Sequence, residues 1–317
     1  MRLLVSGGAG FIGAHVVFQA LHAGHEVTVL DNLSSGCLNN LDKVKEDVRF
    51  IKADIRNVDV LHQAVSHIDI VYHLAASVGM QRSIDNPFLD SDINVMGTLN
   101  ILEASRKHGV AKVVLASSAG ILGESHQLPL SENHPKDPTS PYGVSKMAAE
   151  AMTLVYNRIY GLPTVALRYF NVYGPLQRFD AYGNVIPIFA QQILKQEPLN
   201  IYGDGGQTRD FVYVGDLARA TVMAGTMDKA LGVYNIGSGT SISINDLVHV
   251  MQDVFEGGVP VRYLPVKLGD VRHSLASIDR AITDLNYHVT TSLPDGLRHY
   301  RDWLLPQWEK GGTECVS

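Results

Sequence analysis

Tyr142 and Lys146 are the residues of this sequence whose types and spacing best suit proton transfer. They stand four positions apart in the segment 141–160, which is predicted to be one helix, so both side chains lie on one face. A phenol in water has a pKa of about 10 and is a poor base at neutral pH, but a neighbouring ammonium favours the phenolate. We therefore expect Tyr142 to act as a general base that Lys146 supports.

Ser118 strengthens this interpretation, because a tyrosine and a lysine at this spacing are common on solvated helices. It ends a predicted strand, 112–118, and offers a hydroxyl to the oxygen on which Tyr142 would act. Ser118, Tyr142 and Lys146 are thus the predicted catalytic residues.

A glycine-rich turn predicts what the site binds. Gly7, Gly10 and Gly13 follow a short apolar strand and open a helix, a context that favours a dinucleotide-binding turn over a plain strand-helix connection. The glycines let the backbone approach a pyrophosphate, and the helix N-terminus supplies amides for the anion. Asp31 ends the second strand, where a carboxylate binds ribose hydroxyls and repels a 2′-phosphate, so NAD is favoured over NADP.

The elements that position these residues alternate along the chain. Apolar runs at 2–6, 26–30, 48–52, 69–76, 112–118 and 163–169 predict six strands, and 11–23, 87–108 and 141–160 predict helices between them. This order predicts an α/β fold with a Rossmann-type, doubly wound parallel sheet. After residue 170 the sequence becomes glycine-rich with shorter periodic segments, such as 186–196 and 245–255. We expect an NAD-binding domain over 1–170 and a smaller α/β substrate domain over 171–317, some segments of which return to the first.

Composition excludes several classes of protein. The 317 residues carry a formal net charge of −6 without a block of basic residues, which argues against nucleic acid and anionic membranes as partners. No apolar run is long enough for a signal peptide or a membrane span, so a cytoplasmic location is expected. Cys37 and Cys315 lack CxxC spacing, and His22 and His25 lack an HExxH context, so we expect neither a disulfide framework nor a metal site.

Several motifs together resemble the extended short-chain dehydrogenase/reductase superfamily over nearly the whole chain. They are the GxxGxxG turn, Asp54-Ile55, the segment 73–76, Asn94 and the segment 142–146. The resemblance implies that Asp54 and Ile55 contact adenine, that Ala75 and Ala76 pass beside the cofactor, and that Asn94 supports its far half. The predicted cofactor-binding set is Gly7, Gly10, Phe11, Ile12, Gly13, Asp31, Asn32, Asp54, Ile55, Leu74, Ala75, Ala76, Asn94, Ser117, Tyr142, Lys146 and Phe170.

The residues after Ser118 narrow the reaction that the resemblance implies. Sugar nucleotide 4,6-dehydratases carry an Asp-Glu pair there and uronate decarboxylases a Glu, whereas this chain has no carboxylate until Glu124. A site with one hydroxyl base and one hydride acceptor suits oxidation and re-reduction of a single carbon. The chain therefore resembles UDP-glucose 4-epimerase-like enzymes, although Gly120-Ile121-Leu122 replaces the more usual small-Val-Tyr.

The second half resembles the substrate segments of these enzymes. The resemblance implies that Asn171 binds the diphosphate region, that Arg209 forks onto phosphate oxygens, and that Arg272 lies beside the diphosphate. Arg209 is alternatively a partner for Asp210. The predicted substrate-binding set is Ser118, Asn171, Asn184, Val185, Arg209, Asp270, Arg272 and Ser274, and Lys267 stands where an arginine is more usual.

Ser274 bears on the choice of sugar. In the resembling enzymes this position borders the C2 substituent, and a tyrosine there restricts the site to unsubstituted hexoses. A serine predicts room for an N-acetyl group, so UDP-N-acetylglucosamine and UDP-N-acetylgalactosamine join UDP-glucose and UDP-galactose as expected substrates.

Two alternatives stay open. One is a UDP-glucuronate 4-epimerase, in which polar side chains near Ser118 and Arg82 hold a C6 carboxylate. The other is a nonenzymatic NAD-binding regulator on the same fold, against which the presence of Ser118, Tyr142 and Lys146 argues. The resemblance also implies a homodimer that pairs through the two predicted helices 87–108 and 141–160.

Overall fold

A parallel sheet of seven strands forms the centre of the protein. The computed structural model describes residues 1–124, 127–179, 184–266 and 271–309. The order of the strands across the sheet is β11-β6-β5-β4-β1-β2-β3, and every pair is parallel. Their bounds are β1 Arg2–Ser6, β2 Glu26–Asp31, β3 Val48–Lys52, β4 Ile70–His73, β5 Lys112–Ser118, β6 Thr164–Tyr169 and β11 Gly232–Ile236. β2 and β3 extend the sheet on one side of β1, and β4 and the strands after it extend the sheet on the other side. Doubly wound sheets bind ligands at this point, where the order of the strands changes direction.

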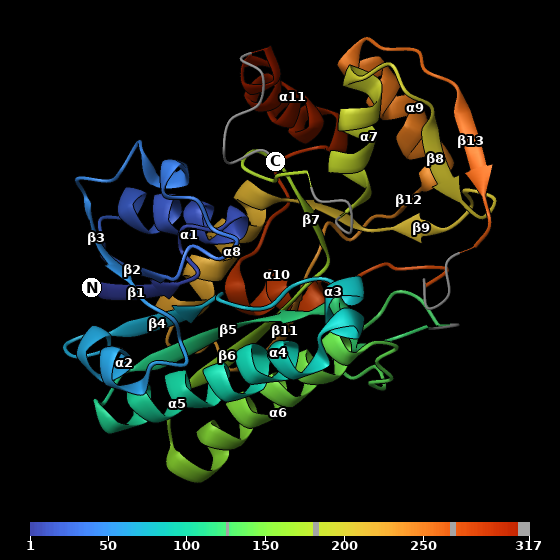
Figure 1. The fold of residues 1–317 in the computed structure, drawn as a ribbon. Helices are drawn as coiled ribbons and strands as arrows, with labels where there is room; N and C mark the ends of the chain where they lie inside the picture. The colour runs from blue at the N-terminus through green and yellow to red at the C-terminus, as the bar shows by residue number, and fades with distance from the viewer. Residues whose placement is uncertain (125–126, 180–183, 267–270, 310–317) are drawn as a thin grey trace.

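Helices cover both faces of this sheet (Figure 1). One face carries α1 (Phe11–His22), α8 (Val214–Thr226) and α10 (Asp279–Leu285), whose apolar residues share one core with β1 and β2. The other face carries α2 (Val58–Ala64), α5 (Gly97–Lys107) and α6 (Pro141–Tyr160). The predicted α/β fold class is confirmed.

The sequence prediction of six strands was one strand short. β11 pairs with β6 in register from Val165↔Gly232 to Tyr169↔Ile236, so a strand from the second half of the chain completes the sheet. β4 is also shorter than predicted, because β1 ends at Ser6 and offers no further strand for Leu74 and the residues after it to pair with.

The two long helices illustrate how local signals set element bounds. α6 begins after Ser140, whose hydroxyl accepts a hydrogen bond from the Gly143 amide at 3.1 Å, and ends before Gly161 in the left-handed region at φ 67°. The predicted helix 87–108 is three pieces, α4 (Pro87–Ser91), a π-helical turn η2 (Asp92–Met96) and α5. Asn94 lies in that turn, and π turns are often found at functional sites. α3 (Met80–Asp85) packs beside α4 and α6.

The remaining elements surround a second core above the carboxyl edge of the sheet (Figure 1). They are β7 (Asn171–Tyr173), α7 (Val185–Leu194), β8 (Leu199–Tyr202), β9 (Thr208–Arg209), β10 (Phe211–Tyr213), β12 (Ile242–Ser243), α9 (Ile244–Phe255), β13 (Val261–Leu264) and α11 (Leu293–Glu309). The strands among them pair as three two-stranded sheets, β10-β7, β12-β9 and β13-β8. The short helical turns η1 (Leu38–Leu41) and η3 (Ala119–Ile121) follow β2 and β5.

Two general features complete the description. Among the residues that the structure describes, no helix is both long and apolar enough to cross a bilayer. Cys315, the second of the two cysteines, lies outside the described residues, so the expectation about the cysteines stays a prediction.

Candidate functional site

The glycine turn brings β1, β4 and α1 together at the carboxyl edge of the sheet. Gly7 has φ +72°, and a Cβ at this position would lie 2.6 Å from the amide nitrogen of Ala75. A Cβ on Gly13 would lie 2.0 Å from the Gly7 carbonyl oxygen. Gly10 caps α1 without a side-chain hydrogen bond, so the first-turn amides of the helix are presented to an anion. Both close approaches require glycine, as a dinucleotide turn does.

Asp31 lies beside this turn at the end of β2. Its carboxylate accepts hydrogen bonds from the amides of Ala9 at 3.0 Å and Leu33 at 2.8 Å. Burial raises the pKa of this carboxyl group, while the two amides oppose the rise. A Cβ on Gly36 would lie 3.0 Å from both carboxylate oxygens, so the following loop passes close to Asp31. A glycine turn next to a fixed carboxylate fits the pyrophosphate and ribose of NAD.

Asp54 and Ile55 follow β3 near the same edge. The Asp54 carboxylate accepts hydrogen bonds from the Asn32 amide at 2.8 Å and from Arg56, which holds the pKa of Asp54 well below its usual range. The Ile55 side chain is packed against Gly97, where a Cβ would lie 2.4 Å from its Cδ1 atom. Ile55 therefore places its side chain in the core and brings Asp54 to the surface beside Asn32.

Asn94 connects the segment after β4 to α6. Its side-chain amide donates to the Ser77 carbonyl and to the Ser145 hydroxyl, both at 3.0 Å, and its carbonyl accepts from the Ser77 amide at 2.8 Å. The Ser145 hydroxyl in turn lies 2.5 Å from a carboxylate oxygen of Asp90 on α4. The sequence identified Asn94 but missed Asp90, which carries no local motif. The whole group holds α4, η2 and α6 in one arrangement beside Tyr142.

The three predicted catalytic residues meet at the ends of β5 and α6. Tyr142 and Ser118 flank Gly120, where a Cβ would lie 3.8 Å from Cε1 of Tyr142 and 3.2 Å from Oγ of Ser118. The Gly120 amide donates to the Ser118 hydroxyl at 3.1 Å. Lys146 lies one helical turn after Tyr142 and donates to the Ala116 carbonyl at 2.6 Å. The structure thus brings the three predicted catalytic residues to one place.

Burial is the largest influence on the pKa values at this site. It raises the pKa of Tyr142, Ser118 lowers that pKa, and the charge of Asp90 raises it further. Burial lowers the pKa of Lys146 to about 8, against the opposing effects of Asp90 and Glu150. That a cationic neighbour favours the phenolate of Tyr142 stays a prediction.

Ser117 differs from its neighbour Ser118, because side chains of consecutive strand residues point to opposite faces. Its hydroxyl donates to buried Glu150 at 2.7 Å. Glu150 also accepts a two-pronged bond from buried Arg168, at 2.8 and 3.0 Å, and an ion pair from Lys136 at 2.8 Å. This charged group lies against β5 on the face opposite the predicted catalytic Ser118. Ser117 was predicted to bind the cofactor, whereas the pairing of Glu150 with Arg168 and Lys136 was not predicted.

The second half places the predicted substrate residues around β7 and β9. The side-chain and backbone nitrogens of Asn171 both donate to the Asp210 carbonyl at 3.1 Å. Arg209 donates to the Thr208 carbonyl at 2.9 Å. The alternative was that Arg209 pairs with the Asp210 carboxylate. That carboxylate accepts hydrogen bonds from the amides of Ser238, Gly239 and Ala276, and so connects the loop after β11 to the segment after Ser274. Phe170 is buried just before β7, and Asn184 and Val185 begin α7.

Ser274 and Arg272 lie next to β9. The Ser274 amide donates to the Thr208 carbonyl at 3.1 Å, and the Arg272 carbonyl accepts from the Thr208 amide at 3.0 Å. The Arg272 amide donates to Glu124 at 2.6 Å, which connects this segment to the residues after β5. Ser274 is only 9% exposed, so any side-chain enlargement there meets neighbouring atoms. Asp270 and Lys267 lie outside the described residues.

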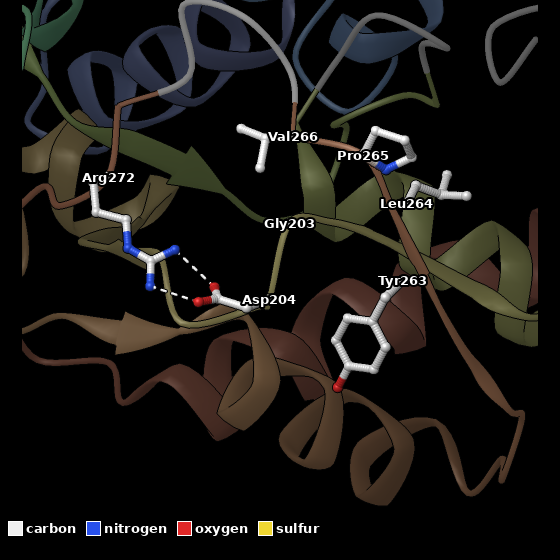
Figure 2. A pocket seen from close by; sticks show the side chains of 7 residues that line it. All are labelled: Gly203, Asp204, Tyr263, Leu264, Pro265, Val266 and Arg272. Atoms are coloured by element: carbon white, nitrogen blue, oxygen red, sulfur yellow. Dashed lines mark hydrogen bonds and ion pairs between the residues drawn. The ribbon is translucent and has the colours of Figure 1, made fainter.

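The Arg272 guanidinium forks onto the carboxylate of Asp204, at 2.7 and 2.9 Å (Figure 2). This pair borders an open cavity of about 620 Å³ at the ends of β8 and β13. Its other lining residues are Gly203, Tyr263, Leu264, Pro265 and Val266. Among the described residues, Arg272 is the one predicted substrate residue that lines this cavity, and none of the three predicted catalytic side chains does.

Comparison with known proteins identifies the family. The family model "NAD dependent epimerase/dehydratase family" matches residues 3–237. A putative UDP-glucose 4-epimerase from Methanocaldococcus jannaschii is 40% identical over 304 residues, which cover 95% of this chain and 98% of that protein. The chain belongs to the NAD-dependent epimerase/dehydratase family, which confirms the predicted superfamily and the predicted cofactor.

Two solved structures are similar throughout. A UDP-N-acetylglucosamine 4-epimerase from Methanobrevibacter ruminantium M1, in complex with UDP-N-acetylmuramic acid, has a TM-score of 0.92 at 36% identity and covers 96% of this chain and 98% of its own. A UDP-glucuronic acid 4-epimerase from Bacillus cereus, in complex with UDP-glucuronic acid and NAD, has a TM-score of 0.89 at 34% identity and covers 96% and 99%. Because the chain belongs to this enzyme family, the alternative of a nonenzymatic NAD-binding regulator is wrong.

Proposed function

We propose that this protein inverts C4 of a UDP-sugar through a 4-keto intermediate. The observation that carries the proposal is that the side chains of Ser118 and Tyr142 meet beside Gly120, with Lys146 one helical turn after Tyr142. NAD, when bound, would supply the acceptor for the C4 hydride. Tyr142 receives the proton of the C4 hydroxyl, and Ser118 holds the same oxygen. Inversion follows when the keto sugar presents its opposite face before it is reduced.

The residues around the glycine turn are proposed to hold NAD. Gly10 and the start of α1 bind the pyrophosphate, Asp31 binds the adenosine ribose, and Asp54 with Asn32 lies at the adenine end. Lys146 orients the nicotinamide half beside Tyr142. Residues 1–170 thus form the proposed cofactor domain, and 171–317 the proposed substrate domain, from which β11, α8 and α10 return to the sheet.

The residues around β9 are proposed to hold the nucleotide. Arg209 and Arg272 supply positive charge for the diphosphate, and their backbones are held together through Thr208. Asn171 and Asn184 contribute amides from the start of β7 and the N-cap of α7.

For the sugar, we propose UDP-glucose and UDP-galactose together with their N-acetylated counterparts. The small Ser274 supports this choice, and so do the relatives named for glucose and N-acetylglucosamine. UDP-glucuronate is the second candidate, because a similar structure holds UDP-glucuronic acid. Incubating the purified protein with each UDP-sugar and separating the products by chromatography tests all of these. No C4-inverted product from any of them would contradict the proposal.

The assembly is proposed to be a homodimer through α4, α5 and α6. Val144, Val155 and Ile159 of α6 recur at helical spacing along one face, and all three are exposed. Phe88 on α4 is 88% exposed, which is unusual for a phenylalanine outside an interface. A cytoplasmic location stays a prediction, which cell fractionation tests.

A further inference from the structure

Asp90 on α4 is a buried carboxylate that the proposed reaction does not use. It is 1% exposed. One carboxylate oxygen accepts from the Ser145 hydroxyl at 2.5 Å, and the other from the Asn94 amide at 3.2 Å. Both partners are neutral. A buried carboxylate costs much free energy unless positive charge lies nearby, so its position calls for a cation.

Lys146, the residue after the Asp90 partner Ser145, is the cation on which the charge of Asp90 acts. It follows Ser145 directly in α6, is 5% exposed, and bonds to a backbone carbonyl rather than to a carboxylate. The charge of Asp90 raises the pKa of Lys146 against the effect of burial, so the two groups are electrostatically coupled. The Ser145 hydroxyl also lies 3.0 Å from the Tyr142 carbonyl, which places Asp90 at the turn of α6 that carries both functional residues.

The other ionisable groups around this pair are accounted for. Glu150, one turn beyond Lys146, also raises the pKa of Lys146, and it is itself paired with Arg168 and Lys136. His73 on β4 stays neutral, since burial and Lys146 lower its pKa to about 3.

The elements packed against α4 and α6 carry other charged groups, on η2, α5 and α3. Asp92 of η2 pairs with Arg56, and Glu103 of α5 pairs with Arg106. Arg82 and Asp85 lie on α3, where Asp85 accepts from Gln81.

We propose that Asp90 is a positioning residue that keeps Lys146 protonated and, through Ser145, fixes the first turns of α6. The proposal rests on the proposed function, in which Tyr142 is the base and Lys146 its cationic neighbour. Beside the Tyr142 phenolate and the Lys146 ammonium, Asp90 is a third charge, and it determines the pH range over which the enzyme turns over its substrate.

The direction of the effect follows from the signs of the charges. The negative Asp90 raises the pKa values of both Tyr142 and Lys146. Replacing it by a neutral amide lets the phenol ionise at lower pH and lets the ammonium lose its proton at lower pH. Both limbs of a bell-shaped pH profile therefore move toward acid.

The first test uses Asp90→Asn, which keeps the shape of the side chain, and Asp85→Asn as a matched control on the exposed neighbouring helix. The pH dependence of kcat on UDP-glucose is measured for each. Asp90→Asn should shift both limbs down by about one pH unit, whereas Asp85→Asn should match the wild type. Ser145→Ala keeps the charge, so it should lower kcat without moving the limbs. A folded Asp90→Asn variant with an unmoved profile would overturn the proposal.

A second test does not depend on turnover. The phenolate absorbance of Tyr142 is isolated by subtracting the titration of Tyr142→Phe, first in the wild-type background and then in Asp90→Asn. The midpoint should fall by about one pH unit when Asp90 is neutralised. An unchanged midpoint rejects the role of Asp90 even if the enzyme is active. A wild type that turns over no UDP-sugar would reject the proposed function, while this titration still decides the role of Asp90.

Discussion

The side chains of Ser118 on β5 and Tyr142 on α6 meet beside Gly120, although they belong to different elements. The strand and the helix therefore fix the phenol from two sides. Tyr142→Phe should keep the fold and the bound NAD but lower kcat by about 10²–10⁴-fold, the usual loss on removing a positioned base. Product formation measured together with the circular dichroism spectrum checks this. Near-normal turnover would mean that another group is the base.

Lys146 should lower the free energy of unfolding, because its ammonium is buried in the folded protein. Its pKa is about 8 in the folded protein against an ordinary value of 10.5, so the folded state holds the proton less tightly than the unfolded chain. The resulting penalty is complete below pH 8 and disappears as the pH rises through 8 to 10.5. Lys146→Met should thus be inactive yet more stable at pH 7, by about 1–2 kcal/mol. Urea unfolding at pH 7 and pH 9.5 should show this difference shrinking, and a constant difference would contradict the assignment.

Asp31 should control the choice of cofactor. Its carboxylate is held against the glycine turn by the Ala9 amide, so it cannot move away from a 2′-phosphate. The wild type should release NAD when denatured, seen as nucleotide absorbance in the supernatant. Asp31→Asn should weaken the preference for NAD over NADP by about tenfold, since one charge contact is worth about 1–2 kcal/mol. Titration of cofactor-free protein with both dinucleotides measures the ratio.

Ser274 should select between substituted and plain sugars. Because it is nearly buried beside β9, a tyrosine there overpacks the site, which costs about 1–3 kcal/mol. Ser274→Tyr should lower the kcat/KM ratio of UDP-N-acetylglucosamine over UDP-glucose by about tenfold to a hundredfold. Ser274→Ala is the control and should leave the ratio close to that of the wild type. A ratio unchanged in Ser274→Tyr would show that this residue does not border C2.

Ile159 should contribute to subunit pairing. It is 69% exposed on the same face of α6 as Val155, so a charge there meets water in a monomer but an apolar partner in a dimer. Ile159→Glu should halve the mass seen by light scattering and leave the unfolding temperature of the monomer unchanged. Val289→Glu, at an exposed position outside α4, α5 and α6, serves as the control. A wild type that is already monomeric would reject the dimer.

The sequence predicted most reliably those features that are local. The predicted helix 141–160 has the bounds of α6, with Pro141 as its first residue and Gly161 in the left-handed region after its end. The structure adds Ser140 as the cap. The spacing of Tyr142 and Lys146 follows from that helix. The same reasoning could not say that the Lys146 ammonium bonds to Ala116, because that contact depends on how α6 packs on β5.

The features that the sequence did not predict depend on distant residues. Glu150, Arg168 and Ser117 come from three elements, and their buried pairing appears only when β5, β6 and α6 are assembled. No sequence motif surrounds Asp90, and its proposed role depends on a hydrogen bond from Ser145, 55 positions away. Such polar groups are found by asking which buried charges have partners, a question that needs coordinates.

β11 has a consequence for how the chain folds as it leaves the ribosome. Strand β6, whose residues Thr164–Tyr169 are all buried, has its outer edge covered by β11, which is completed only at Ile236. A nascent chain that has emerged only as far as α6 and β6 presents an apolar strand with unpaired backbone groups, the kind of edge that recruits other chains. Fragments cut between β6 and β11 should therefore associate and precipitate, so the cofactor half is not an independent product of synthesis.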